Sequence, residues 1–173
     1  MTVDTEQTEP ATTIYIYTDG GCYYKTGVGA WAWAMCDAPD ADPLITNTAY
    51  VDGTTSNRME LRAAIEALRY LLTHQVGPEG SYEKVVLTSD SQYLVNSIQY
   101  WAKAWRARGW RKSDGKEVQN SDLWEELLEL VKQIEIEWKH VRGHTGNKIN
   151  TLCDTMATDQ MQLLYMLKSK RLA

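Results

Sequence analysis

The chain has 173 residues, a formal net charge of −5 and a hydrophobic fraction of 43%. This length suits one domain with a single sizeable core. The three cysteines are far apart and lack CxxC spacing, which argues against a disulfide framework or a zinc site and favours a reducing cytoplasm. No stretch of the sequence resembles a membrane span. The composition therefore excludes a membrane protein and a small secreted scaffold held by disulfides.

A single domain is expected over residues 14–168. Residues 1–13 are polar and acidic without apolar periodicity, which predicts a disordered tail and not a signal peptide. Residues 169–173 are expected to form a short C-terminal tail. The sequence contains neither an internal repeat nor a linker that would divide the domain.

Alternating and helical apolar patterns follow one another along this domain. They predict strands at 14–19, 29–36, 44–51, 85–90 and 134–141, and helices at 57–75, about 91–109, 121–132 and about 148–168. The Pro- and Asp-rich connection 37–43 favours an antiparallel meander of the first three strands. A strand–helix–strand crossover then makes the fourth strand parallel to the first. We expect an α/β domain whose mixed five-stranded sheet, with strands four and five parallel to strand one, is flanked by helices.

The net charge conceals a basic segment. Residues 101–118 hold six cations and two acids, a net of +4, which leaves −9 on the rest of the chain. Trp101, Trp105 and Trp110 lie among these cations. Exposed aromatic rings between cations suit base or sugar stacking beside phosphate contacts. The alternative is that Trp101 and Trp105, four residues apart on one helix face, only pack this helix onto the body of the domain.

Three carboxylates lie where surface charge explains them poorly. Asp19 and Asp90 each close an apolar strand pattern, and Glu60 projects from the buried face of the helix at 57–75. Parallel pairing of the first and fourth strands would place Asp19 and Asp90 side by side. Together the three side chains offer hard oxygen ligands suited to Mg²⁺ or Mn²⁺.

Each of these carboxylates also has a structural alternative. Asp19 could form a turn before the two glycines that follow it, Asp90 could cap a helix, and Glu60 could form a capping box with Asn57. The metal site is favoured because capping does not explain why all three positions should converge.

Two further residues stay open on the sequence pattern alone. Asp154 lies at the margin of the apolar stripe of the last helix, so it belongs equally well to the site or to the surface. His144 lies in a glycine-flanked polar loop, where simple solvation is the usual state. A proton-transfer role follows only if this loop borders the carboxylates.

Several motifs, in order along the chain, resemble those of type 1 ribonuclease H, the RNA–DNA hybrid endonuclease. They are TDGGC (18–22), TTSNRMEL (54–61), TSDSQYL (88–94), WAKAWRARGW (101–110), SDLW (121–124), VRGHTGN (141–147) and CD at 153–154. Each motif alone is weak, whereas the ordered set is specific and spans about 14–160. The resemblance implies a ribonuclease H-like fold.

The resemblance also implies a mechanism. Asp19, Glu60, Asp90 and Asp154 would bind two Mg²⁺ ions, for which Mn²⁺ can substitute, and His144 would assist proton transfer or product release. The implied reaction is hydrolysis of the RNA strand of RNA–DNA hybrids to 5′-phosphate and 3′-hydroxyl ends, with a role in removing primers and hybrids during replication. We expect a monomer without an obligate protein partner. The alternatives are a catalytically idle hybrid-binding module and a structure-selective DNA nuclease of the same superfamily.

Nucleic-acid contacts are implied as well. The residues expected to line the minor groove and sense ribose 2′-hydroxyls are Gly20, Gly21, Cys22, Ser56, Asn57 and Gln92. The DNA strand is expected to meet Tyr93, Trp101 and Trp105, beside a basic handle at about 101–118. Gly53 stands where many members of the family carry an arginine of the DNA-phosphate pocket, which leaves Thr55 as the clearest remaining member of that pocket. We expect Lys25, Arg106 and Arg108 to compensate in part.

Overall fold

The computed structural model describes residues 12–76, 82–143 and 146–171, so the predicted N-terminal tail falls mainly outside it. The described residues form a sheet with the strand order β3-β2-β1-β4-β5. The strands are β1 (Thr13–Tyr23), β2 (Val28–Cys36), β3 (Ile45–Val51), β4 (Lys84–Ser89) and β5 (Ile136–His140). The pairs β1–β2 and β2–β3 are antiparallel, whereas β1–β4 and β4–β5 are parallel. The predicted mixed sheet is confirmed.

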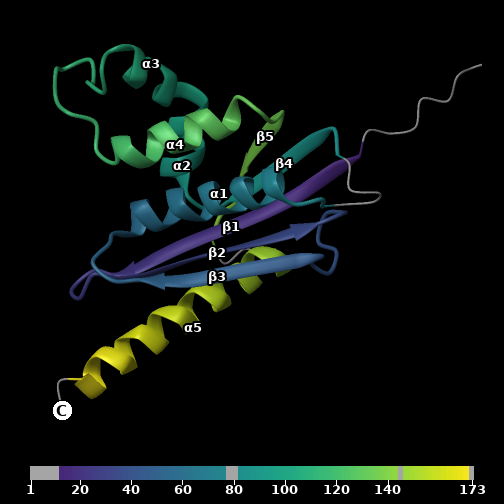
Figure 1. Ribbon diagram of the computed structural model, residues 1–173, viewed down its shortest axis with the longest axis vertical. Coiled ribbons are helices and arrows are strands. Elements are labelled where there is room, and N and C mark those ends of the chain that lie inside the picture. The colour runs from purple at the N-terminus through teal and green to yellow at the C-terminus, as the bar shows by residue number, and fades with distance from the viewer. Residues whose placement is uncertain (1–11, 77–81, 144–145, 172–173) are drawn as a thin grey trace, which may run out of the picture.

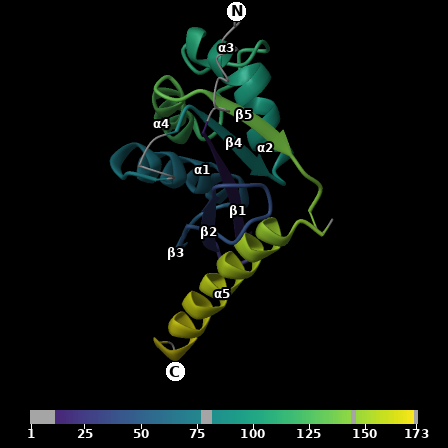
Figure 2. The ribbon, with the colours of Figure 1, turned by 90° about the vertical axis from the view of Figure 1, so that its right-hand side faces the viewer.

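Helices cover both faces of the sheet (Figure 1). They are α1 (Ser56–Thr73), α2 (Gln92–Asn96), α3 (Ala102–Ala107), α4 (Ser121–Val131) and α5 (Lys148–Arg171), with a π-helical turn, η2 (Ser97–Trp101), between α2 and α3. On one face α1 packs over β1 and β2, and α4 packs on α1. On the other face α5 crosses β1, β2 and β3, as Figure 2 shows from the side. The sheet therefore has a core on each face.

The alternation of β2 explains why the two cores differ. Its large residues, Trp31, Trp33 and Met35, belong to the core under α1, and its alanines at 30, 32 and 34 belong to the core under α5. Successive side chains of a strand point to opposite faces, so a large–small pattern fills one side and leaves little bulk on the other. The face with the large side chains is covered by α1, on which α4 packs, and the face with the alanines is covered by α5 alone among the described helices.

The strand β1 is longer than predicted. It continues past Asp19 to Tyr23, because β2 pairs with it as far as the couple Tyr23 and Val28. Its pairing with β4 stops earlier, at Thr18 and Ser89. The prediction that the first strand ends on a carboxylate was therefore wrong: Asp19 lies inside β1, at the level where the neighbouring strand β4 ends.

The predicted helix at 91–109 is interrupted by the π-helical turn η2. A π turn adds one residue to the hydrogen-bonded ring and so shifts the faces of the helix that follows it. Trp101 at its end is 53% exposed. Trp105 instead packs edge-on against Trp124, with 6.1 Å between the ring centroids. The two tryptophans thus differ in setting, and the packing alternative applies to Trp105 only.

The other predicted elements need only small changes of their bounds. The fifth strand is shorter than predicted, at Ile136–His140, and the last helix continues to Arg171. None of the helices in the described part of the chain combines the length and the apolar character needed to cross a bilayer.

Gly20 is the point at which β1 touches α1. A Cβ atom at this position would meet the backbone of Met59 and Glu60, whereas a Cβ at Gly21 would meet the flexible thioether of Met161 at 3.3 Å. We expect Gly20→Ala to lower the free energy of unfolding by about 2 kcal/mol or more, because helix backbone cannot yield as a side chain does. Gly21→Ala should lower it by less than about 1 kcal/mol. Urea denaturation of both variants measures this, and equal midpoints would contradict the close approach.

Candidate active site

Asp19, Glu60 and Asp90 meet at the end of the β1–β4 pair. Thr18 and Ser89 form the last parallel couple, so Asp19 and Asp90 follow it on neighbouring chains. Glu60 comes from the second turn of α1, which lies against β1 at Gly20. One carboxylate oxygen from each of the three side chains lies within 4.8 Å of the others. The convergence expected from strand order is present.

The buried carboxylate of Glu60 has no capping role. The N-cap of α1 is Thr55, whose hydroxyl oxygen accepts the backbone N–H of Arg58 at 3.2 Å. Asn57 lies inside the helix, so the capping box considered from the sequence does not form. The structural alternative for Glu60 is therefore excluded.

The structural alternatives for the two aspartates are excluded in the same way. The N-cap of α2 is Ser91, whose hydroxyl accepts the N–H of Leu94 at 3.1 Å, so Asp90 caps no helix. Asp19 accepts the N–H of Gly20 at 2.9 Å, but within a strand that continues and not at a turn.

Burial and mutual repulsion raise the pKa values of these carboxyl groups. Asp19 is 5% exposed and Glu60 is 9% exposed. Burial, and then the charges of Asp90 and Asp154, raises the pKa of Asp19 to about 8. Burial, and then the charges of Asp19 and Asp90, raises the pKa of Glu60 well above its ordinary value. The pKa of Asp90 is also raised, by burial and by the charge of Asp154. An ionised cluster of this kind needs a cation to be stable.

The donor set fits a divalent cation. Within the described residues the buried Oε2 atom of Glu60 has no hydrogen-bond partner. A buried carboxylate oxygen without a partner is strongly unfavourable, and a bound cation removes this penalty. All three converging ligands are carboxylate oxygens, which suit Mg²⁺ or Mn²⁺ better than softer metals.

Asp154 lies beside this cluster. It is exposed on α5 and lines a cavity of about 30 Å³ together with Asp90. Its charge raises the pKa of both Asp19 and Asp90, so its carboxylate is near both. The preceding residue, Cys153, is buried, and its thiol donates to the carbonyl oxygen of Tyr17 at 3.5 Å. This contact holds the turn of α5 that carries Asp154 against β1.

The end of β5 and the loop after it also reach the cluster. His140 Nε2 lies 3.1 Å from the carbonyl oxygen of Asp90. A Cβ atom at Gly143 would lie 3.3 Å from Oδ2 of Asp90, so the described part of this loop borders the carboxylates. The predicted site residue His144 itself falls outside the described residues.

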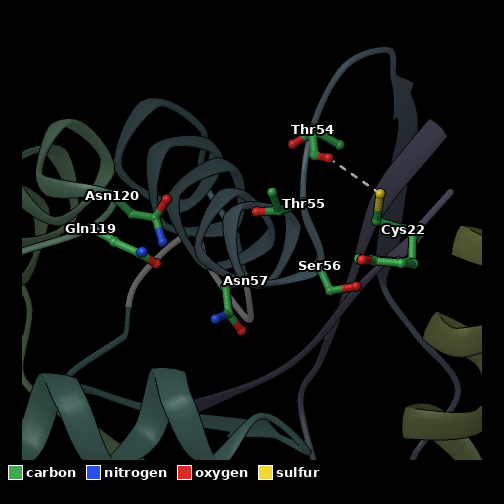
Figure 3. Close-up of a pocket in the computed structure, with 8 residues that line it drawn as sticks. Cys22, Thr54, Thr55, Ser56, Asn57, Gln119 and Asn120 are labelled. Atoms are coloured by element: carbon green, nitrogen blue, oxygen red, sulfur yellow. Dashed lines mark hydrogen bonds between the residues drawn. The ribbon is translucent and has the colours of Figure 1, made fainter. Parts of the chain in front are cut away.

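An open pocket of about 770 Å³ lies at the N-terminus of α1 (Figure 3). It is lined by Cys22, Tyr24, Thr54, Thr55, Ser56, Asn57, Gln119 and Asn120. In Figure 3 the Cys22 thiol points to the carbonyl oxygen of Thr54, to which it donates at 3.4 Å, and Gln119 and Asn120 form the opposite wall. Sequence reasoning missed Gln119 and Asn120, since they precede α4 and belong to no apolar pattern. An asparagine just before a predicted helix predicts an N-cap and not a pocket contact, so it gave no direct signal of this role.

The remaining predicted contacts lie on α2 and on the handle. Gln92 is exposed in the first turn of α2, and Tyr93 packs against Trp124 with 5.6 Å between ring centroids. Arg106 pairs with Glu129 at 3.0 Å and with Glu125 at 3.7 Å. Arg108 is the C-cap residue of α3 and is exposed. Gly20 and Gly21 both lie in β1.

Comparison with known proteins decides the family. Residues 11–162 match the sequence family described as RNase H. The chain belongs to the ribonuclease H family. It is 41% identical over 150 residues to a Ribonuclease H of Caldanaerobacter subterraneus subsp. tengcongensis, covering 86% of this chain and 91% of that one. It is 42% identical over 146 residues to a Ribonuclease H of Pseudoalteromonas atlantica, covering 84% and 88%.

Solved structures agree with this assignment. LC9-RNase H1, described as a type 1 RNase H with the type 2 active-site motif, has a TM-score of 0.70 at 29% identity and covers 89% of this chain and 74% of its own. LC11-RNase H1, solved in complex with an RNA/DNA hybrid, shares the fold with a TM-score of 0.67 at 18% identity, covering 88% and 99%. The resemblance to ribonuclease H is confirmed, and the chain is a hydrolase that acts as an endoribonuclease.

The raised pKa values predict that the metal-free protein loses stability as the pH rises. The pKa of Asp19 is about 8 in the folded chain, against roughly 4 when unfolded. The folded state thus binds more protons in this interval, and the free energy of unfolding decreases with pH. We expect the Tm in chelator to fall between pH 5 and pH 9, and Asp19→Asn to flatten that fall. Scanning calorimetry measures both, and a pH-independent Tm in the parent would contradict the cluster.

Added Mg²⁺ separates this cluster from ordinary surface charge. At pH 8 the ion should raise the Tm of the parent by mass action, and should raise that of Asp19→Asn much less. The matched control is Asp159→Asn, because Asp159 is an exposed carboxylate on α5 outside the cluster. This control should respond to Mg²⁺ as the parent does.

Proposed function

We propose that the chain hydrolyses the RNA strand of RNA–DNA hybrids, with Asp19, Glu60, Asp90 and Asp154 holding two Mg²⁺ ions, for which Mn²⁺ can substitute. The observation that carries this proposal is the convergence of three carboxylates within 4.8 Å, together with a buried Glu60 oxygen that has no hydrogen-bond partner among the described residues. The family supports it, because the relatives that cover most of this chain are ribonucleases H.

The protein contributes position more than covalent chemistry. When bound, the ions lower the pKa of the attacking water and offset the charge on the leaving oxygen. Asp19 and Asp90 are fixed by neighbouring strands of the sheet, and Glu60 by the contact of α1 with Gly20. Asp154 approaches from α5, the other side of the sheet. Four separate elements, β1, β4, α1 and α5, thus hold the ligands, and the expected products carry 5′-phosphate and 3′-hydroxyl ends.

We propose that the pocket at α1 and the adjoining part of β1 recognise the two strands. Cys22, Ser56 and Asn57 in the pocket, Gly20 and Gly21 of β1 and Gln92 of α2 would contact the minor groove and the ribose 2′-hydroxyls. Thr55 and Asn120 would hold a phosphate of the DNA strand. Gly53 has a φ of 70°, a left-handed conformation that disfavours an arginine at this position. The phosphate would then be bound by neutral donors.

The basic handle, residues 101–118, would contact the DNA strand through an exposed ring. Trp101 is 53% exposed, whereas Trp105 packs against Trp124. Stacking of a base or sugar on Trp101 fits this difference. Trp105 then supports the handle from beneath, together with the ion pairs of Arg106.

Several finer predictions accompany this function. His144 is expected to assist proton transfer or product release. Removal of RNA primers during replication, a cytoplasmic location and a monomeric state without an obligate protein partner all stay predictions.

The decisive assay compares an RNA–DNA hybrid, double-stranded RNA and double-stranded DNA, each with Mg²⁺ or with chelator. We expect the native chain to cut only the RNA of the hybrid and only with Mg²⁺, and Asp90→Asn nearly to abolish cleavage, because the ligand set is broken. Hybrid binding without cleavage would indicate an idle binding module. Cleavage of double-stranded DNA would indicate a DNA nuclease of the same superfamily.

Two tryptophan variants test the handle. Trp101→Ala should raise the Kd for the hybrid about tenfold, a loss typical of one stacked base, with little change in Tm. Trp105→Ala should lower the Tm instead, because it removes a partly buried ring that packs on Trp124. Fluorescence anisotropy and calorimetry measure the two effects, and a large fall in Tm for Trp101→Ala would contradict the stacking role.

A further inference from the structure

Asn120 has an uncommon arrangement at the start of α4. It is the N-cap residue, its φ of 62° and ψ of 26° are left-handed, and its side chain makes no capping hydrogen bond. An N-cap asparagine ordinarily accepts a free N–H of the first helical turn with its side-chain oxygen. The carboxamide of Asn120 lines the pocket at α1 instead (Figure 3).

Arg58 decides which end of this carboxamide is free. Its Nη1 donates to Oδ1 of Asn120 at 3.4 Å, and Nδ2 of Asn120 donates to the hydroxyl of Tyr93 at 3.1 Å. A guanidinium only donates hydrogen bonds, so it can bond only to the oxygen of the amide and not to its NH₂ group. A hydroxyl both donates and accepts, so Tyr93 alone would tolerate either orientation. Within the described residues the second N–H of the Asn120 amide has no partner.

Arg58 is itself fixed by a two-pronged ion pair. Its Nη1 and Nη2 donate to Oδ1 and Oδ2 of Asp122 at 3.0 and 2.8 Å. The hydrogen bond to Asp122 raises the pKa of Arg58, and the same bond lowers the pKa of Asp122. Fork-to-fork pairs of this kind add geometric specificity as well as energy. The guanidinium therefore has one defined position from which to hold Asn120.

The backbone at position 58, independent of its side chain, also orients Thr55 in the same pocket. The backbone N–H of Arg58 donates to Oγ1 of Thr55 at 3.2 Å. The hydroxyl of Thr55 is thereby used as an acceptor, which leaves its own hydrogen to be donated elsewhere. The pocket is lined by Cys, Tyr, Thr, Ser, Asn and Gln side chains, without a charged one. Binding of an anion in this pocket therefore depends on the orientation of neutral hydrogen-bond donors.

We propose that Arg58 is a positioning residue, whose guanidinium turns the N–H of Asn120 toward one phosphate of the DNA strand, beside the hydroxyl of Thr55. This inference rests on the proposed function, because it requires the hybrid in this pocket. A phosphate oxygen only accepts, so an amide presenting its oxygen would repel it, and one presenting its N–H binds it. Arg58 holds the amide so that its N–H faces the phosphate, without contacting the phosphate itself.

The test uses hybrids in which one DNA phosphate at a time is replaced by a neutral methylphosphonate. Binding is measured by fluorescence anisotropy with the full chain carrying Asp90→Asn, so that the hybrid is not cut. We expect one position at which the replacement raises the Kd about tenfold in this parent. Adding Arg58→Met or Asn120→Ala should reduce the effect at that position to about twofold or less, as a double-mutant cycle measures.

The matched control is Arg62→Met. Arg62 lies one turn further along α1 and also pairs with carboxylates, Glu66 and Glu126, but does not line the pocket. It should keep the full methylphosphonate effect. Tyr93→Phe should keep it as well, since Arg58 still orients the amide. Loss of the effect in Tyr93→Phe with its retention in Arg58→Met would overturn the assignment.

Other outcomes separate this inference from the function beneath it. A native chain that cuts the hybrid in Mg²⁺ while its Asp90→Asn form shows no sensitive phosphate overturns the role of Arg58 and leaves the function intact. A native chain that does not cut the hybrid removes both. If calorimetry shows that Arg58→Met does not fold, Asp122→Asn replaces it, because this change loosens the guanidinium and keeps Arg58. A full methylphosphonate effect in Asp122→Asn would then overturn the proposal.

Discussion

The backbone contact between β1 and α1 at Gly20 is the constraint on which the site depends. The sheet alone can bring together only Asp19 and Asp90, because they follow the last couple of two parallel strands. The third carboxylate comes from a helix, and a helix reaches a strand this closely only where the strand has no Cβ. The peptide group between Met59 and Glu60 makes this contact, so one missing side chain allows the Glu60 carboxylate to lie within 4.8 Å of the other two.

This arrangement opposes folding until a cation is bound. Burial and repulsion raise the pKa values of Asp19, Glu60 and Asp90 together, so their ionised forms are destabilising near neutral pH. The two cores must supply the stability that the cluster removes, and fully buried residues such as Trp33 and Trp124 lie in the larger of them. Functional sites commonly hold such unfavourable features, which the surrounding structure sustains. The same repulsion makes binding of a divalent cation favourable.

Sequence patterns predicted the features of the fold that depend on burial. They missed the features that depend on particular hydrogen bonds. The alternation of β2 and the crossover to β4 were readable, because apolar periodicity reports which faces are covered. The extension of β1 past Asp19 could not be read from the sequence, since beyond Asp19 this strand is hydrogen-bonded to β2 and no longer to β4. The π turn η2 changes the hydrogen-bond ring without changing the apolar composition. Asn120 was missed for a related reason: its partner Arg58 lies 62 residues away, and no local pattern joins them.

The handle contributes less free charge than its composition suggests. Arg106 is paired with two glutamates of α4, and Arg111 lies 3.5 Å from Glu117 within the handle itself. Cations already paired within the protein release fewer counterions from a nucleic acid, and binding then depends less on salt. The pocket at α1 also favours binding that depends little on salt, because its lining is neutral and its donors are oriented by hydrogen bonds. On an acidic chain, the proposed contacts through oriented neutral donors and the exposed indole of Trp101 would select a hybrid without attracting nucleic acids at large.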